Sequence, residues 1–301
     1  MKKPSIIHMF DPNRNTSPFD INMAVDGGFD HVFPYDDVKL EDINGLVQDA
    51  IFSRGPSGVK RTAIFIGGRD IGLAMGMMDA AKQAMVPPFE VSVLSDPSGA
   101  FTTAAALVAC VEKEVKEKHG KELQDCKAIV FGGTGPVGIA TGVISALAGA
   151  NTTLVDHLNI DNALEKADEY NKLCGTELVG TYASSDADKA RLVSHADIIF
   201  CTAKAGIQVL NASVLDDATQ LKAAGDVNAV PPLGIEGIKL NDLGEPLKFA
   251  THSQGAVGIG ALAVGNVKYK LQHELLDGLL SLEKPVYYDF REAFNKARQL
   301  V

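Results

Sequence analysis

Short apolar runs alternate with longer segments of helical periodicity along this chain. In the first half, four runs have the length and composition of strands: Ile6–Phe10, His31–Pro34, Ala63–Ile66 and Val91–Leu94. Between them, apolar residues recur at the spacing of one helix face, as they do from Leu40 to Ile51. Strands that alternate with amphipathic helices are typical of a parallel α/β architecture. The pattern therefore predicts the α/β class.

A second series of strands and helices begins in the middle of the chain. The helix predicted over Thr102–Lys118 is followed by Gly120, and glycine is the usual residue just past a helix C-terminus. Further strands are expected at Lys127–Phe131, Thr152–Val155, Asp197–Cys201 and Leu221–Val227. We therefore predict an N-terminal α/β domain over residues 1–122 and a Rossmann-type, doubly wound parallel sheet over residues 123–267. The helical tail, residues 268–301, is expected to pack back on the first domain.

Composition and charge narrow the class of protein. A chain of 301 residues is long enough for two domains of roughly 100–200 residues each. The net charge of −10 argues against a nucleic-acid or anionic-membrane surface. No run approaches the ~18 apolar residues of a membrane span, and Asp11-Pro12 interrupts the N-terminal apolar stretch before a signal-peptide core forms. The cysteines and histidines are dispersed without metal-ligand spacing. We expect a cytoplasmic protein with no metal, nucleic-acid or membrane partner.

A glycine-rich loop opens the second domain. Gly133-Thr134-Gly135-Pro136-Val137-Gly138 directly follows an apolar strand and begins a helix, which is the context that a dinucleotide-binding fingerprint requires. The first glycine permits a tight turn, the second lets the backbone approach a pyrophosphate, and the third permits close packing of helix and strand. The free N–H groups of the helix N-terminus attract the anion, and Pro136 loses no hydrogen bond there. These six residues are predicted to bind NAD or NADP.

The end of the next strand bears on the choice of nucleotide. Asp156 follows Gly133 at a distance where an acid commonly bonds the ribose hydroxyls of NAD, whereas NADP sites usually place an arginine nearby. His157 comes next, and the first basic side chain after it is Lys166. We predict that NAD is preferred and that NADP binds at best through His157 or Lys166. A solvated acid with no ligand is the alternative for Asp156.

Six further segments resemble one family in order and spacing, the bacterial NAD(P)-dependent methylenetetrahydromethanopterin dehydrogenases of one-carbon metabolism. They are Ser17–Ala24, Ile51–Arg54, Ile64–Gly68, Phe101–Ala105, Gly225–Ile235 and Gly258–Lys270. The resemblance extends from Ser5 to the terminal helix. It looks closer to the branch that accepts NAD as well as NADP than to the NADP-restricted branch, which also accepts the folate analogue. The NADP-restricted branch carries a Gly-Arg-Lys-like turn at the position where this chain has Val155–Asn159.

The resemblance implies a reaction and an assembly. Methylenetetrahydromethanopterin would give a hydride to the nicotinamide and become the methenyl cation, as a step of formaldehyde oxidation. The N-terminal domain would bind the pterin, face the Rossmann domain across an active-site cleft, and belong to a homo-oligomer, a trimer or a hexamer. The hydride leaves a carbon between two amine nitrogens, whose lone pairs stabilise the cation, and no proton moves in that step. Catalysis is therefore expected to rest on orientation and electrostatics.

The resemblance also points to residues for the pterin. Asp20 matches a family position in the pterin pocket, although with Ser17 it also completes a capping box. Lys268 matches the family lysine after the glycine-containing run. It is expected to position the pterin, since a cation too close to the forming cation would oppose hydride departure, and a surface lysine that begins a helix is the alternative. We expect Asp20 and Lys268 to be the catalytic residues. Thr102 and Thr103 either touch the nicotinamide and substrate or only cap a helix.

The ends of two later strands complete the predicted cofactor site. Ligands of such sheets bind outside the carboxyl ends of the strands. Thr202 and Ala203 end one strand and are expected to line the site. Asn228 follows the next strand and is expected to bond the nicotinamide carboxamide.

Three other functions stay open at this point. The first is the same hydride transfer from methylenetetrahydrofolate. The second is a shikimate-dehydrogenase-like enzyme, which would want a Lys/Asp pair for proton transfer to a hydroxyl, and the sequence has no clear counterpart. The third is a noncatalytic dinucleotide sensor, which would bind NAD without turnover. Retention of both Asp20 and Lys268 with their surrounding segments argues against the sensor.

Overall fold

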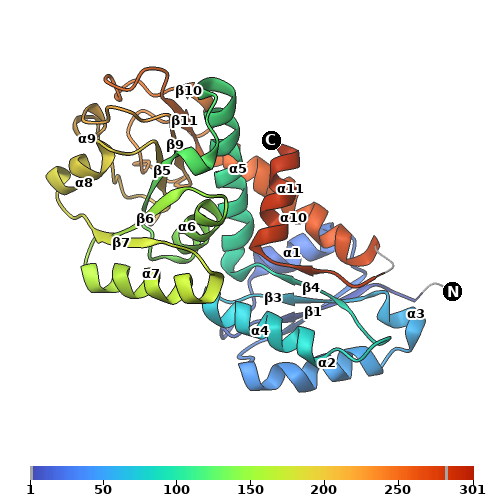
Figure 1. The fold of residues 1–301 in the computed structure, drawn as a ribbon. Coiled ribbons are helices and arrows are strands. Elements are labelled where there is room, and N and C mark those ends of the chain that lie inside the picture. Colours follow the sequence, from blue (N-terminus) through green and yellow to red (C-terminus); the bar gives the residue numbers. More distant parts are fainter. Residues whose placement is uncertain (1–2, 282–283) are drawn as a thin grey trace. The chain divides into compact units, whose positions relative to one another are not determined.

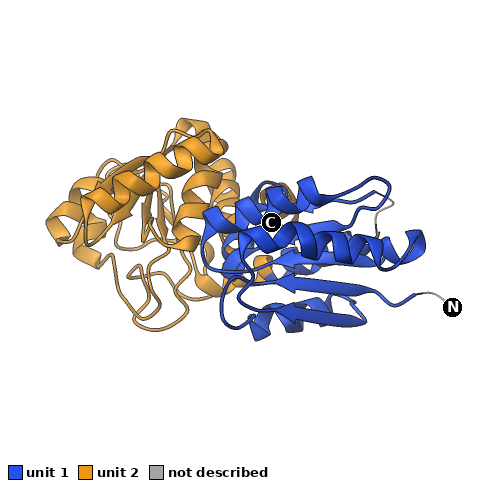
Figure 2. Ribbon diagram, turned by 90° about the horizontal axis from the view of Figure 1, so that it is seen from below, with its two compact units in different colours: residues 1–102, 269–293 blue, residues 103–268, 294–301 orange. Residues whose placement is uncertain are grey.

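The computed structural model describes residues 3–281 and 284–301, which divide into two compact units. Unit 1 comprises residues 1–102 and 269–293, and unit 2 comprises residues 103–268 and 294–301 (Figure 2). Each unit contains its own sheet. The α/β class with two largely parallel sheets is thereby confirmed, whereas the boundary near residue 122 stays a prediction.

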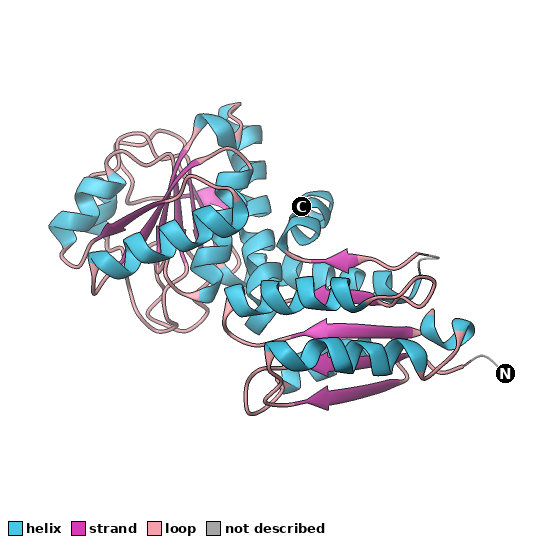
Figure 3. Cartoon of the chain, turned by 60° about the horizontal axis from the view of Figure 1, so that its bottom comes forward, coloured by secondary structure: helices cyan, strands magenta, loops and turns pink. Residues whose placement is uncertain are grey.

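Unit 1 is built on a five-stranded sheet in the order β12-β4-β3-β1-β2, and every pair in it is parallel. The strands are β1 (Ile6–Phe10), β2 (His31–Tyr35), β3 (Thr62–Ile66), β4 (Ser92–Ser95) and β12 (Tyr287–Tyr288). Its helices are α1 (Pro18–Asp26), α2 (Ile43–Phe52), α3 (Pro56–Val59) and α4 (Ile71–Ala84). Figure 3 shows the strands of this sheet pointing in one direction. Their carboxyl ends therefore share one edge, where a ligand of such a unit is expected to bind.

The core of unit 1 explains why α2 and α4 form where they do. Ile43, Val47 and Ile51 lie on one face of α2, and all three are buried against the sheet. Ala74 and Met77 of α4 join the same cluster. The apolar spacing that predicted a helix after residue 40 is therefore the face that this helix buries.

Unit 2 is built on a seven-stranded sheet in the order β10-β11-β9-β8-β5-β6-β7, in which β10 alone pairs antiparallel (Figure 1). Its strands are β5 (Lys127–Phe131), β6 (Asn151–Asp156), β7 (Val179–Tyr182), β8 (Ile198–Cys201), β9 (Ala223–Asp226), β10 (Leu243–Pro246) and β11 (Val257–Ile259). Its helices are α6 (Pro136–Leu147), α7 (Ile160–Cys174), α8 (Asp186–Val193) and α9 (Ala212–Asp216). The chain runs outward from β5 through β6 to β7 and then resumes at β8 on the other side of β5. This reversal is the switch point at which doubly wound sheets bind ligands.

Three helices carry residues of both units, namely α5 (Ala100–His119), α10 (Ala261–Ser281) and α11 (Phe290–Leu300). α5 ends before Gly120, whose φ of 61° lies in the left-handed region, as expected for a residue past a helix end. α10 begins at Ala261, so the helical tail starts earlier than the predicted Lys268. The sequence pattern did not reveal this start, because the first turns of α10 consist of small and apolar residues without polar contrast.

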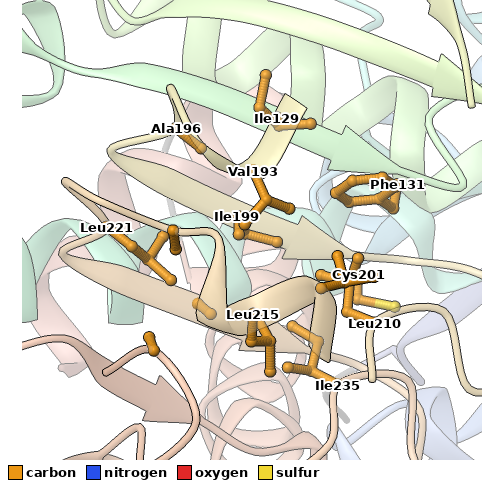
Figure 4. Packing of buried hydrophobic residues seen from close by; sticks show 14 of the residues in the cluster. Ile129, Phe131, Val193, Ala196, Ile199, Cys201, Leu210, Leu215, Leu221 and Ile235 are labelled. Carbon is orange, nitrogen blue, oxygen red and sulfur yellow. The ribbon is translucent and has the colours of Figure 1, made fainter. Parts of the chain in front are cut away.

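One hydrophobic cluster of unit 2 lies between its sheet and α8 and α9 (Figure 4). Ile199 of β8 packs with Val193 from the end of α8 and Leu215 of α9, and all three side chains are fully buried. Phe131, at the end of β5, belongs to the same cluster and also lines the pocket described below. The cluster therefore supports the strand ends that form the candidate site.

Candidate dinucleotide-binding site

The turn after β5 is made by Gly132, one residue before the predicted fingerprint. Gly132 has a φ of 74°, a conformation that glycine adopts readily. A Cβ on it would also lie 2.7 Å from the backbone nitrogen of Ala203. Gly133 is required for space, since its Cβ would lie 2.8 Å from the Val130 carbonyl oxygen and 2.8 Å from the Val155 nitrogen. The tight turn assigned to Gly133 thus belongs to Gly132, because the left-handed residue is the one that reverses the chain.

The other two glycines of the loop differ sharply in their surroundings. A Cβ on Gly138 would lie 2.1 Å from the Gly132 carbonyl oxygen, so only glycine lets α6 approach the end of β5. A Cβ on Gly135 would have its nearest neighbour at 3.6 Å, so the fold itself leaves room there. Gly135 is the N-cap of α6, and it has no side chain to satisfy the first N–H groups, which lack partners inside a helix. The space and the free donors both fit the approach of a phosphate.

A pocket of about 520 Å³ lies beside this loop, wholly within unit 2. Its lining residues are Phe131, Gly132, Thr134, Gly135, Val155, His157, Ala183, Ser184, Lys189, Thr202, Ala203, Lys204, Ile207, Gln208 and Val209. The pocket thus joins the glycine loop to the ends of β5, β6, β7 and β8. Apolar side chains alternate with hydroxyl and cationic groups in this lining, which suits a nucleotide that carries both a base and phosphates.

Asp156 is buried at the end of β6, and both of its carboxylate oxygens are occupied by protein donors. Oδ1 accepts the backbone N–H groups of Leu158 (2.6 Å) and Asn159 (3.0 Å). Oδ2 accepts the Thr134 hydroxyl (2.7 Å) and the Asn162 amide (2.7 Å). Burial by itself raises the pKa of this carboxyl, but the four hydrogen bonds outweigh it and lower the pKa to about 2. Asp156 therefore ties the glycine loop to the start of α7 as a carboxylate.

The residues after β8 and β9 are linked by one buried amide. The Asn228 side-chain oxygen accepts the N–H groups of Gly206 (3.0 Å) and Val230 (2.9 Å), and its amide nitrogen donates to the Pro232 carbonyl at 2.9 Å. The Thr202 hydroxyl donates to the Phe131 carbonyl at 3.0 Å. Asn228 thus holds the two loops together, and its contact with the nicotinamide carboxamide stays a prediction.

The residues expected to contact the pterin lie on three helices. Asp20 is 5 % exposed in the first turn of α1. The predicted capping box is wrong, because the Ser17 side chain makes no capping hydrogen bond. Lys268 is half-buried inside α10. The Thr102 hydroxyl is buried in α5 and donates to the Asp96 carboxylate at 2.6 Å, so Thr102 does not itself cap the helix. The ligand contacts of Asp20, Lys268, Thr102 and Thr103 stay predictions.

Asp96 was not predicted from the sequence, nor were several lining residues of the pocket, among them Ser184 and Lys189. Asp96 is fully buried and accepts the backbone N–H groups of Phe101 (3.0 Å) and Thr102 (3.1 Å), so it caps α5. An aspartate two residues before a Ser-Gly turn is a local signal that could have identified this cap. No comparable local signal marks Lys189, because only the fold brings α8 beside the glycine loop.

Comparison with known proteins identifies the family. A family profile described as the N-terminal part of methylene-tetrahydromethanopterin dehydrogenase matches residues 18–98. The chain is 42 % identical over 296 residues to the NAD(P)-dependent methylenetetrahydromethanopterin dehydrogenase of Methylorubrum extorquens, with 98 % of each chain covered. This chain belongs to the NAD(P)-dependent methylenetetrahydromethanopterin dehydrogenase family. The family predicted from the sequence is confirmed.

This chain is also similar to a second curated protein and, in fold, to a solved structure. A second protein of Methylorubrum extorquens, described as the bifunctional protein MdtA, is 32 % identical over 295 residues, with 98 % of each chain covered. Among solved structures, the NAD-dependent malic enzyme of Thermotoga maritima matches with a TM-score of 0.55 at 11 % identity, over 99 % of this chain and 84 % of that chain. This last likeness concerns the fold alone and agrees with the Rossmann-type sheet of unit 2.

Two features are absent from the part of the chain that the structure describes. Within residues 3–281 and 284–301, no helix is both long enough and apolar enough to cross a membrane. The same part of the chain holds no group of three or more His, Cys, Asp or Glu side chains arranged for a metal ion.

Proposed function

We propose that this protein oxidises methylenetetrahydromethanopterin with NAD(P)+ to give methenyltetrahydromethanopterin. The observation that carries the proposal is the likeness to the Methylorubrum extorquens dehydrogenase along 98 % of both chains. The glycine loop and its pocket support it, because they offer the space, the backbone donors and the apolar walls that a dinucleotide needs. When bound, the nicotinamide ring supplies the hydride acceptor.

The protein's own contribution in this proposal is binding and orientation. Val137 and Gly138, at the start of α6, present backbone N–H groups to the pyrophosphate. The loops held by Asn228 and the end of β8 position the nicotinamide half. Asp20 and Lys268 bind and orient the pterin and are proposed as the catalytic residues. The cation is stabilised by the substrate's own nitrogen lone pairs, so no general base is required.

We further propose that NAD+ is the preferred acceptor in a cytoplasmic homo-oligomer. The turn after β6 reads Asp156-His157-Leu158-Asn159 and contains no arginine to pair with a 2′-phosphate. The pterin is proposed to bind in the N-terminal domain, residues 1–122, and the nucleotide in residues 123–267.

The test is the rise of absorbance at the reduced-nicotinamide band. Purified protein receives methylenetetrahydromethanopterin or methylenetetrahydrofolate, each with NAD+ or NADP+. Turnover with the methanopterin substrate, faster with NAD+, is expected. Faster turnover with the folate substrate would mean that the reaction is the same hydride transfer but that the substrate is a folate. Nucleotide binding without turnover on either pterin would contradict the proposed activity and favour a sensor.

Asp20→Asn is expected to raise the KM for the pterin about tenfold, because it removes a charged acceptor for the pterin's amine and amide donors. The KM for NAD+ is expected to stay within a factor of about two. Asp26→Asn, an exposed acid at the other end of α1, is the matched control and is expected to change neither constant. Initial rates over a grid of both substrates give the constants. An equal rise in both KM values for Asp20→Asn would contradict a pterin-binding role.

A further inference from the structure

The adenosine end of the pocket lacks a free acid. In Rossmann-type sites the residue after the second strand, here the end of β6, contacts the adenosine ribose. Asp156 occupies that place, but it is only 4 % exposed and its two oxygens already accept four hydrogen bonds within the protein. A ribose hydroxyl would have to displace one of those donors. Selection between the 2′-hydroxyl and the 2′-phosphate must therefore come from other side chains of this pocket.

Lys189 of α8 supplies a cation to the same pocket. Its side chain is 15 % exposed, and its ammonium nitrogen lies 3.4 Å from Asp186 Oδ1. The Asp186 side chain is 59 % exposed, so solvent screens this ion pair and weakens its hold on Lys189. A cation that is largely shielded from water interacts with a phosphate more strongly than an exposed one does.

Ser184 adds a hydroxyl donor to the pocket that Lys189 also lines. The Ser184 oxygen accepts the Tyr182 hydroxyl at 2.8 Å, and a serine that accepts one hydrogen bond still has its own proton to donate. Ser184 lines the pocket and follows β7, the neighbour of β6 in the sheet. A cation and a hydroxyl donor on adjoining elements form a pair suited to a phosphate monoester.

Two other lysines, Lys166 and Lys204, are less suited to this role. Lys166, which the sequence suggested, lies on α7 and forms an ion pair with Glu169 at 2.7 Å. It is not among the residues that line the pocket. Lys204 also lines the pocket, but it is exposed to solvent, whereas the Lys189 side chain is only 15 % exposed. Lys189 is therefore the pocket lysine whose charge solvent screens less.

We propose that Lys189, assisted by Ser184, forms a subsite for the 2′-phosphate of NADP+ and determines how well this dehydrogenase uses NADP+. The inference rests on the proposed function only in taking a dinucleotide as the cofactor. It assigns the 2′-phosphate to α8 in place of Lys166, which does not line the pocket. Because solvent screens the Lys189–Asp186 ion pair, Asp186 is expected to weaken binding of the 2′-phosphate only modestly.

The test measures nucleotide binding by calorimetry, without pterin. Adenosine 2′,5′-bisphosphate carries the 2′-phosphate, and adenosine 5′-monophosphate is its counterpart without that group. Lys189→Gln is expected to weaken binding of the bisphosphate about tenfold and that of the monophosphate less than twofold. Lys166→Gln is the matched control and is expected to change neither. Asp186→Asn keeps an acceptor for Asn211 and is expected to tighten the bisphosphate about threefold by releasing Lys189.

Two outcomes would overturn the proposal. Equal weakening of both nucleotides in Lys189→Gln would place the lysine against the adenine or the 5′-phosphate. Unchanged binding of the bisphosphate in Lys189→Gln would show that Lys189 does not contact the 2′-phosphate. Lys189→Arg, which keeps the charge, is expected to retain the discrimination and so separates loss of charge from loss of folding. Because no pterin is present, failure of the dehydrogenase assay would leave this result intact, and the two proposals fail separately.

Discussion

Gly138→Ala is expected to lower kcat/KM with either nucleotide by at least about 100-fold. The added Cβ would lie 2.1 Å from the Gly132 carbonyl oxygen and 2.8 Å from the Gly133 Cα. Both neighbours are backbone atoms, so no side chain can rotate away and the start of α6 must move. The N–H groups proposed to hold the pyrophosphate would move with it. Calorimetric titration with NAD+ and thermal unfolding of the free protein measure the two consequences.

Two other glycine substitutions separate binding from folding. Gly135→Ala is expected to leave the thermal midpoint nearly unchanged, because its Cβ has no neighbour closer than 3.6 Å, yet to weaken NAD+ where the phosphate approaches. Gly45→Ala, in α2, has nothing within 4 Å and is expected to stabilise the protein by about 0.5–1 kcal/mol. Full NAD+ affinity in both Gly138→Ala and Gly135→Ala would contradict the assignment of this loop to the pyrophosphate.

Much of the fold could be predicted from the sequence, because burial and periodicity are local properties. The bounds predicted for β1 and β5 agree with the structure at both ends, since each is an apolar run with polar or turn residues around it. The edge strands β7 and β10, the three-residue β11 and the two-residue β12 escaped prediction. β10 contains a glycine and a proline and pairs antiparallel at the sheet edge, so its strand character depends on β11 and not on its own composition.

The candidate site was less predictable, because its polar side chains form hydrogen bonds with residues that are distant in the sequence. The glycine loop could be recognised, since its spacing encodes the turn and the helix start together. Thr134 and Asn162 both donate hydrogen bonds to Asp156 Oδ2. These bonds form because the glycine loop and α7 both pack against the end of β6. In the same way, Asn228 bonds Gly206 across loops that follow different strands. A motif predicts that a polar residue lies near a ligand, but the competing donors appear only in the fold.

Asp156→Ala is expected to lower the free energy of unfolding by about 3 kcal/mol, because it leaves four donors without their acceptor. It is also expected to lower kcat/KM about tenfold, and by the same factor for NAD+ and NADP+, since the glycine loop loses its tie to α7. Chemical denaturation and initial rates with each nucleotide measure the two effects. Asp156→Asn keeps the shape and two acceptor sites, so it is expected to fall between Asp156→Ala and the parent protein. A loss confined to NAD+ would show instead that Asp156 bonds the ribose directly.

The pH dependence of stability tests the same role without a nucleotide. The pKa of Asp156 is lowered from 3.8 to about 2 in the folded protein, so its carboxylate contributes stability above the unfolded pKa. That contribution, about 2 kcal/mol, is expected to be mostly lost as the pH falls from about 4 to the folded pKa of about 2, and fully lost below it. The difference in unfolding free energy between the parent protein and Asp156→Asn should therefore shrink over this interval. A difference that stays constant from pH 5 to pH 2 would mean that the carboxylate charge does not hold the loop, and the role of Asp156 would rest on shape alone.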